Sequence, residues 1–281
     1  MGIAPIIILK DAVTLDYCFI QCIKRCLELP YLDAIYINEG YSSDTTFQEI
    51  SALAKDTNKI KLFRRQWCMD KEFWAREKNF LIEEASKYSE YIFIVDADEI
   101  LLKSSLGYIK KFVENPGDKL GVIAYVYHYM RISDGDNLGT LKQITRPGWY
   151  RYQARLIHRS LNPRLMIVGA NPDDLVGFKG NKMYFIHHRT DMLLRNTDIR
   201  FAHFGYARDA KAMSMKWIRS EKITRGDKEF VNGNIPEPQP YTYPTWGSKD
   251  LIDPLLINPG LLKDELVIDW VSSKYRKHSY P

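Results

Sequence analysis

Residues 91–102 read YIFIVDADEILL, an apolar segment that runs directly into acidic residues. The first five side chains are apolar throughout, as in a central strand that is covered on both faces. Asp96, Asp98 and Glu99 follow at once. In open α/β sheets, ligands bind just beyond the carboxyl ends of the strands. Side chains two positions apart on an extended backbone lie on the same side, so Asp96 and Asp98 can face one ligand.

The first hundred residues alternate between strand and helix patterns. Short apolar runs predict strands at 5–9, 34–38, 59–63 and 91–95, and apolar spacing of three and four residues predicts helices at 15–29, 45–55 and 72–88. This alternation is typical of a mainly parallel sheet with helices packed on its faces. Ser43 or Asp44 is expected to cap the second helix.

The pattern changes after residue 100. The spacing of apolar residues predicts helices at 106–114, 207–224 and 261–274 and strands at 120–132, 150–158 and 183–186. The segment 133–148 reads as a loop and a candidate lid that orders when a ligand binds. The proline-rich stretch 232–260 predicts an extended segment on the surface. These changes divide the chain into residues 1–225, with halves 1–100 and 101–225, and an extension over 226–281.

Composition sets broad limits on function. The chain has 281 residues, a formal net charge of +5 and 45% hydrophobic residues, which suits a globular protein that attracts phosphorylated ligands, an anionic membrane surface or nucleic acid. No apolar run reaches the length of a membrane-spanning helix or of a signal peptide's core, so a cytoplasmic protein, in peripheral contact with a membrane at most, is expected. Cys18, Cys22 and Cys26 fall on one helical stripe and are expected to be small buried core residues rather than metal ligands.

The pair Asp96 and Asp98 suits the chemistry of a sugar–diphosphate bond. Hard carboxylate oxygens are ligands that Mg²⁺ or Mn²⁺ prefers, and such an ion neutralises the charge that develops on a leaving diphosphate. Taken alone, Asp-x-Asp after a strand is more typical of a solvated turn that caps a helix. The surrounding motifs decide between the two interpretations.

The chain resembles the family 2 glycosyltransferases, inverting enzymes with the GT-A fold, on three ordered motifs. Residues 24–29 read KRCLEL, 37–46 read INEGYSSDTT, and 74–80 read WAREKNF ahead of the Asp-x-Asp strand. The second motif departs from the family's acidic pair, because Asn38 and Glu39 stand where two Asp are usual and one residue is inserted. The resemblance continues more loosely with ARLIHR at 154–159 and AHFGY at 202–206.

The resemblance implies a role for each matching position. It implies that Glu39 contacts the nucleobase, that Arg76 approaches the nucleotide, and that Asp96 and Asp98 hold Mn²⁺ or Mg²⁺ and the diphosphate of a nucleotide sugar, with a UDP-sugar favoured. His203 is a further candidate for a metal ligand or a diphosphate contact; a buried structural histidine is the alternative. An exposed helix arginine is the alternative for Arg76.

Inversion requires a carboxylate beside the acceptor hydroxyl to take its proton. Asp173 and Asp174 lie where the resemblance places this catalytic base, although two Asp after a proline also form an ordinary turn. Glu99 and Asp191 are rivals. Of His187 and His188, which follow a short strand and point to opposite faces, at most one is expected to be functional.

The sequence therefore predicts a hexosyltransferase-like enzyme that moves a sugar to a hydroxyl acceptor. A glycan or a lipid-linked acceptor is the default, and protein side chains or a modified base in DNA stay open as acceptor classes. The oligomeric state is not specified. A nucleotidyltransferase needs a glycine-rich loop after the first strand, which residues 10–14 lack. A degenerate, non-catalytic binder of a sugar nucleotide or a protein partner is the second alternative, favoured by the altered turn at Asn38.

Overall fold

A computed structural model describes most of the chain. The described residues are 2–132, 140–144, 152–161, 163–169, 175–179, 181–186, 193–208, 210–225, 251–252 and 264–274. The first half alternates as predicted, with elements β1 (Ile3–Leu9), α1 (Phe19–Leu27), β2 (Ile35–Glu39), α2 (Thr46–Lys55), β3 (Ile60–Arg64), α3 (Phe73–Ser86) and β4 (Tyr91–Ile94). The four strands pair in parallel in the order β4-β1-β2-β3.

The second half extends the same sheet with mixed pairing. Its elements are β5 (Glu99–Leu101), η1 (Lys103–Ser105), α4 (Leu106–Glu114), β6 (Gly121–Ile132), β7 (Thr140–Ile144), β8 (Tyr152–His158), η2 (Arg159–Leu161), β12 (Leu193–Tyr206), α5 (Ala210–Arg225), β13 (Leu251–Ile252) and α7 (Glu265–Lys274). The sheet runs β13-β7-β6-β8-β4-β1-β2-β3, with β12 pairing β6 in parallel and β5 in antiparallel orientation. A separate three-stranded sheet holds β9 (Met166–Ile167), β10 (Leu175–Lys179) and β11 (Lys182–Phe185).

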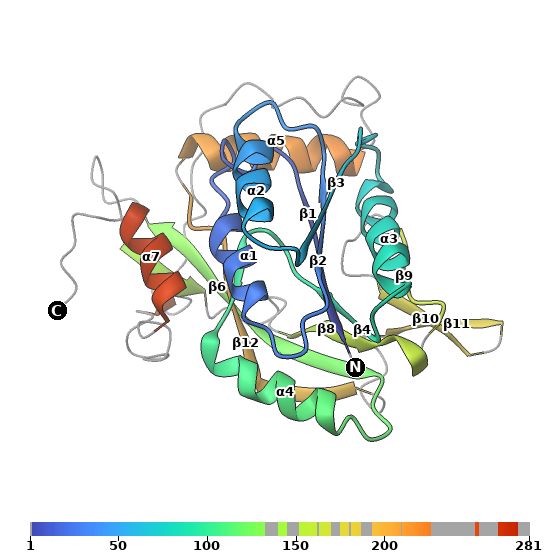
Figure 1. The fold of residues 1–281 in the computed structure, drawn as a ribbon. Helices are drawn as coiled ribbons and strands as arrows, with labels where there is room; N and C mark the ends of the chain where they lie inside the picture. The colour runs from blue at the N-terminus through green and yellow to red at the C-terminus, as the bar shows by residue number, and fades with distance from the viewer. Residues whose placement is uncertain are drawn as a thin grey trace.

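Helices cover both faces of the parallel strands, which explains why β1 and β4 are buried along their whole length. Alternate side chains of β1 point to opposite faces: Ile3 and Ile7 pack with α1, α2 and α4, whereas Ala4 and Ile6 pack with α3. Figure 1 shows α1 and α2 on one side of β1 and β2 and α3 on the other. The predicted α/β class, with a sheet flanked by helices, is confirmed.

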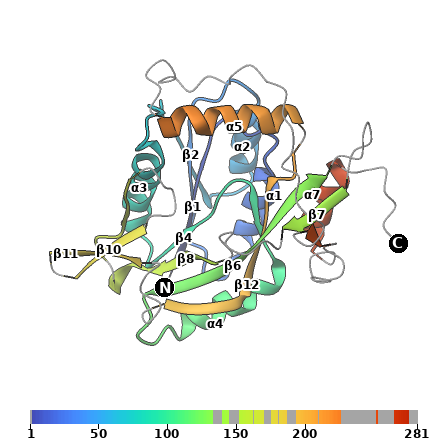
Figure 2. The ribbon, with the colours of Figure 1, turned by 180° about the vertical axis from the view of Figure 1, so that it is seen from behind.

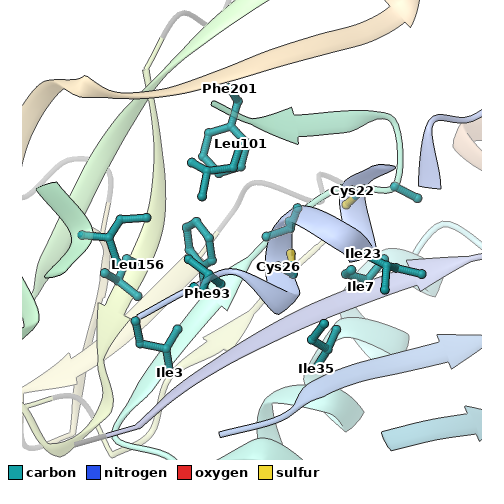
Figure 3. Packing of buried hydrophobic residues seen from close by; sticks show 14 of the residues in the cluster. Ile3, Ile7, Cys22, Ile23, Cys26, Ile35, Phe93, Leu101, Leu156 and Phe201 are labelled. Atoms are coloured by element: carbon teal, nitrogen blue, oxygen red, sulfur yellow. The ribbon is translucent and has the colours of Figure 1, made fainter. Parts of the chain in front are cut away.

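The cysteine stripe lies in the core, as predicted. Cys18, Cys22 and Cys26 are free thiols exposed by 1% or less. Figure 3 shows Cys22 and Cys26 on α1 facing the apolar side chains of the sheet, among them Ile7 and Phe93. Burial raises the pKa of the Cys18 thiol well above its ordinary value, so this group stays neutral and acts as a small apolar side chain.

Three local predictions need correction. Helix α1 begins at Phe19 rather than at residue 15, because Asp16 has a φ of +56°, which no α-helix accommodates. The predicted loop 133–148 contains strand β7, which pairs with β6 and β13, so at least this part is sheet rather than lid. No strand is predicted over β12, whose end is quoted only as the motif AHFGY, since the sequence LLRNTDIRFAHFGY does not alternate regularly and the pairing of β12 has two register shifts.

The C-terminal helix α7 packs on α1. The buried carboxylate of Asp264 accepts a hydrogen bond from Arg25 at 2.6 Å and another from the backbone of Lys103 at 2.7 Å. Residues 226–250 lie outside the described residues, and the division at 225 stays a prediction. Within the part of the chain that the structure describes, no helix is both long and apolar enough to cross a membrane.

Candidate functional site

The acidic turn after β4 is held from two sides. The amide of Phe204 in β12 donates a hydrogen bond to the backbone oxygen of Asp98 at 2.9 Å. On the opposite side, the thiols of Cys18 and Cys22 lie 3.9 and 3.6 Å from the carbonyl oxygens of Ala97 and Asp96. Elements far apart in the sequence therefore fix this turn at the carboxyl edge of the parallel strands.

Asp98 is surrounded by basic side chains. Its Oδ2 accepts a 2.5 Å hydrogen bond from Arg208 and a 3.1 Å bond from Lys216, and the Nε2 of His203 lies 3.6 Å away. Burial alone would raise the pKa of Asp98, but Lys216, His203 and Arg208 outweigh it and hold that pKa well below its ordinary value. Asp98 is therefore an ionised carboxylate whose charge is already compensated.

Asp96 has its own pair of basic partners. Lys78 donates to Oδ1 at 2.9 Å and Arg155 to Oδ2 at 3.3 Å, and both basic side chains are 2% exposed or less. Burial raises the pKa of Asp96, while Lys78 and Arg155 lower it more, to about 2. Asp96 itself is 31% exposed and forms the solvent-facing part of this turn.

Glu99 lies behind the turn. Its Oε1 accepts a 2.6 Å bond from Arg155, and the side chain is 2% exposed. Burial raises its pKa to about 8, with Asp96 and Asp98 adding to the shift and Arg155 opposing it. This position inside the protein, against a guanidinium, sets Glu99 back from the solvent-facing part of the turn.

The residues around Asp98 do not fit a divalent ion. Four basic side chains, Lys78, Arg155, Arg208 and Lys216, face the three carboxylates of residues 96, 98 and 99. Two unit charges 4 Å apart repel by about 4 kcal/mol at an effective dielectric constant near 20, and a divalent ion doubles this for each basic neighbour. Among the described residues, no group of three His, Cys, Asp or Glu side chains is placed to hold a metal. The arrangement instead suits an anion.

A second polar cluster lies at the ends of β2 and β3. The fully buried Glu39 accepts a hydrogen bond from the amide of Ser42 at 2.5 Å and one from Arg64 at 3.0 Å. Arg64 also lies over the ring of Tyr41, 4.5 Å from its centroid, and Tyr41 is 47% exposed with a φ of +54°. The predicted nucleobase contact Glu39 thus lies at the expected edge of the sheet, with both carboxylate oxygens bonded inside the protein.

Helix α5 contacts both the turn after β4 and the residues that follow β1. Figure 2 shows it lying across the carboxyl ends of β1 and β2. Lys216 reaches Asp98, and Arg219, three residues later on the same face, donates to Asp11 at 2.7 Å and to the backbone oxygen of Lys10 at 3.3 Å. One helix therefore places positive charge beside the ends of both β1 and β4.

The altered turn at Asn38 has a structural explanation. Asn38 is buried, accepts a hydrogen bond from the indole of Trp67 at 3.2 Å and donates to Glu77 at 2.9 Å. An aspartate could not donate to Glu77 and would repel it. Arg76 is half-exposed and bonded to Asp70 at 3.0 Å and to Glu77 at 3.2 Å, so in this structure its guanidinium orders the segment before α3.

His203 belongs to the site through two contacts. Its Nδ1 lies 2.8 Å from the Nδ1 of His128 on the neighbouring strand β6, and its Nε2 faces Asp98. Since two ring nitrogens that share one hydrogen bond need one donor and one acceptor, the pair fixes the orientation of the His203 ring. The candidate bases Asp173, Asp174 and Asp191, and the pair at 187–188, lie outside the described residues.

Sequence reasoning missed the basic side chains of the site. Lys78 and Arg155 stand inside the quoted motifs WAREKNF and ARLIHR, and Arg208 lies two residues after AHFGY, so all three lie in or beside these motifs. A search for cations as well as carboxylates near these motifs would have found them. Nothing in the local pattern of α5 distinguishes Lys216 from the helix's other lysines.

Comparisons with known proteins give similarity at the level of the fold. No protein-family model and no curated protein matches the sequence. S. aureus TarS aligns with 81% of this chain and 40% of its own, at 10% identity and a TM-score of 0.45. GalNAc-T7, solved with UDP, GalNAc and Mn²⁺, aligns with 79% of this chain and 48% of its own, at 11% identity and a TM-score of 0.44.

A third similar structure belongs to another activity. The 4-diphosphocytidyl-2C-methyl-D-erythritol synthase aligns with 57% of this chain and 78% of its own, at 12% identity and a TM-score of 0.35. The chain spans less than half the length of TarS and of GalNAc-T7. The GT-A assignment stays a prediction from the sequence motifs. Similarities at this level assign no activity, which has to be argued from the site.

Proposed function

We propose that this protein is a glycosyltransferase of the GT-A type that moves a sugar from a nucleoside-diphosphate donor to a hydroxyl acceptor. The observation that carries the proposal is the group of four basic side chains around Asp96 and Asp98 at the carboxyl edge of the parallel strands. This edge is where open α/β sheets bind ligands, and a diphosphate is the anion that such a group of cations suits.

The reaction that we propose is a direct displacement with inversion. The acceptor oxygen forms a bond to the anomeric carbon as the bond from that carbon to the diphosphate oxygen breaks, and the bonding pair leaves with the diphosphate. A carboxylate takes the hydroxyl proton. Asp173 and Asp174 stay our candidates for this base, and Glu99 is the weaker candidate because it lies behind the turn against Arg155.

The remaining assignments deepen the same proposal. Glu39 and the exposed Tyr41 ring lie at the end of β2. We propose that the nucleobase of a donor whose diphosphate lies at Asp96 and Asp98 contacts these two side chains, and a uridine nucleotide is favoured. The resemblance implies dependence on Mn²⁺ or Mg²⁺. The basic residues Arg208 and Lys216 beside Asp98 argue against a bound divalent ion. A glycan or a lipid-linked hydroxyl is the proposed acceptor class.

Calorimetry and donor turnover together test this function. UDP, GDP, dTDP and their nucleotide sugars are titrated into wild type and into Lys216→Met. Lys211→Met, at an exposed position of α5, is the matched control. One nucleotide is expected to bind wild type and the control, and Lys216→Met is expected to bind it at least about tenfold more weakly, the loss of one charge-assisted contact. Failure of all three nucleotides to bind folded protein contradicts the proposal.

Turnover separates the transferase from the non-catalytic alternative. Wild type is expected to transfer the sugar of the bound donor to water or to added acceptors and to release the nucleoside diphosphate. Tight donor binding without any release across a broad set of acceptors would favour a sugar-nucleotide binding protein.

A further inference from the structure

The chemistry of a diphosphate leaving group requires positive charge beside its oxygens. A divalent ion supplies that charge in one way, and preorganised ammonium and guanidinium groups supply it in another. In this structure, ammonium and guanidinium groups surround the Asp-x-Asp turn. The question is whether they act as a substitute for the ion.

The basic groups converge on one turn. Arg208 and Lys216 share a single carboxylate oxygen of Asp98, and Lys78 and Arg155 bond the two oxygens of Asp96. Even if Glu99, whose pKa is raised to about 8, is counted as ionised, these four cations exceed the three acidic groups of the turn by one charge. A site with excess positive charge attracts an anion and repels a further cation.

Three of the four groups are held rigidly. Arg208, Arg155 and Lys78 are buried, and the guanidinium of Arg208 lies over the ring of Tyr17 at 4.1 Å from its centroid. Their orientation is therefore fixed by folding, and a ligand that they bind does not have to order them. Lys216 differs, because its side chain is 29% exposed and extends from α5 to the solvent-facing side of the turn.

We propose that these basic side chains replace a divalent ion, so that the protein binds its donor's diphosphate without metal. Lys216 exchanges Oδ2 of Asp98 for a phosphate oxygen, and Arg208 supports it from behind. As the sugar–oxygen bond breaks, the charge on the departing diphosphate is compensated by these two groups. Asp96 and Asp98 then serve to hold the cations in position and are not metal ligands. This inference rests on the proposed function, since it concerns how the same donor is held.

The first experiment measures nucleotide and metal binding separately. UDP, GDP, dTDP and inorganic pyrophosphate are titrated by calorimetry into the full chain in excess EDTA and again in Mn²⁺. Binding of one nucleotide in EDTA, with a dissociation constant within about threefold of that in Mn²⁺, is expected because the cations are already present. In parallel, the electron paramagnetic resonance signal of free Mn²⁺ is expected to be unchanged by the protein alone.

Variants test which groups carry the binding. In EDTA, Lys216→Met is expected to weaken nucleotide and pyrophosphate binding at least about tenfold, whereas Lys211→Met leaves it unchanged. Asp98→Asn keeps the shape of the side chain and removes the charge that competes for Lys216 and Arg208. We expect it to strengthen pyrophosphate binding in EDTA, and circular dichroism confirms that each variant is folded.

The outcomes separate this inference from the proposed function. Nucleotide binding that requires Mn²⁺ and disappears in Asp98→Asn would overturn the inference and leave the glycosyltransferase proposal intact. Stoichiometric uptake of Mn²⁺ by the protein alone would overturn it as well. No nucleotide binding in either medium would overturn both.

Discussion

The acidic turns after β2 and after β4 lie at the same edge of the sheet and are built in different ways. At the first turn, Glu39 is bonded to Ser42 three residues on and to Arg64 on the next strand. At the second, the partners of Asp96 and Asp98 come from positions 78, 155, 203, 208 and 216. The first turn draws its partners from residues 10–64, among them Asp11 and Thr14, whereas the second is assembled from both halves of the chain.

This difference predicts where the protein is most sensitive to mutation. Substitutions at the turn after β4 remove partners from buried charges, whereas the Glu39 carboxylate of the turn after β2 is paired with the partly exposed Arg64. The following substitutions test that contrast, from the largest expected effect to the smallest.

Arg155→Met is expected to destabilise the protein by about 3 to 5 kcal/mol, because it removes the buried guanidinium that bonds both Asp96 and Glu99. Urea denaturation followed by circular dichroism measures the change. Arg155→Lys restores the charge without the second donor and should recover part of the loss. A loss below about 1 kcal/mol for Arg155→Met would show that this ion cluster contributes little to folding.

Asn38→Asp is expected to cost about 2 to 3 kcal/mol at neutral pH, because it places a carboxylate against Glu77 in a buried position. Burial and the like charge raise the pKa of the new carboxyl in the folded state, so the penalty is present above the unfolded pKa, near 4, and disappears as the pH falls below it. Denaturation at a series of pH values measures this. A penalty that does not change with pH would mean that lost packing, not charge, is responsible.

Glu39→Gln is expected to cost about 1 kcal/mol, since the amide retains the shape of the side chain and Arg64, which is 36% exposed, regains water. Thermal unfolding compares it with Arg155→Met. Equal losses for the two variants would remove the contrast between the turns after β2 and after β4.

Arg76→Ala is expected to cost less than about 1 kcal/mol, because the Arg76 and Asp70 side chains are both largely solvated. The same unfolding experiment measures it, and nucleotide titration of this variant tests the predicted contact of Arg76 with the nucleotide. Unchanged nucleotide affinity would confine Arg76 to ordering the segment before α3.

The sequence predicted the parallel half of the fold well because its signals are local. Strands such as β4 are continuous apolar runs, and the stripe of Cys18, Cys22 and Cys26 fixed the buried face of α1. The irregular strand β12 was not predicted, because a bulged strand between two partner strands does not need regularly alternating apolar and polar residues.

The same reasoning explains the prediction of the site. Asp96 and Asp98 were found because a strand and its acidic end are adjacent in sequence. Arg208 and Lys216 were not, because only the packing of β12 and α5 against the turn brings them to Asp98. Residues that only the tertiary structure brings together have no characteristic spacing in the sequence. The metal ion was predicted from the carboxylates alone, because the basic residues around them were not identified from the sequence.

The central claim, that a nucleoside diphosphate binds at the carboxyl edge of the parallel strands, is tested most directly by hydrogen–deuterium exchange. Saturating UDP, GDP or dTDP is added, and the exchange of backbone amides is followed by mass spectrometry. The account predicts slower exchange in residues 40–46 after β2 and 96–99 after β4. Protection confined instead to the cavity of about 400 Å³ beside α3, lined by Asn79, Ser86 and Arg159 among others, would contradict it.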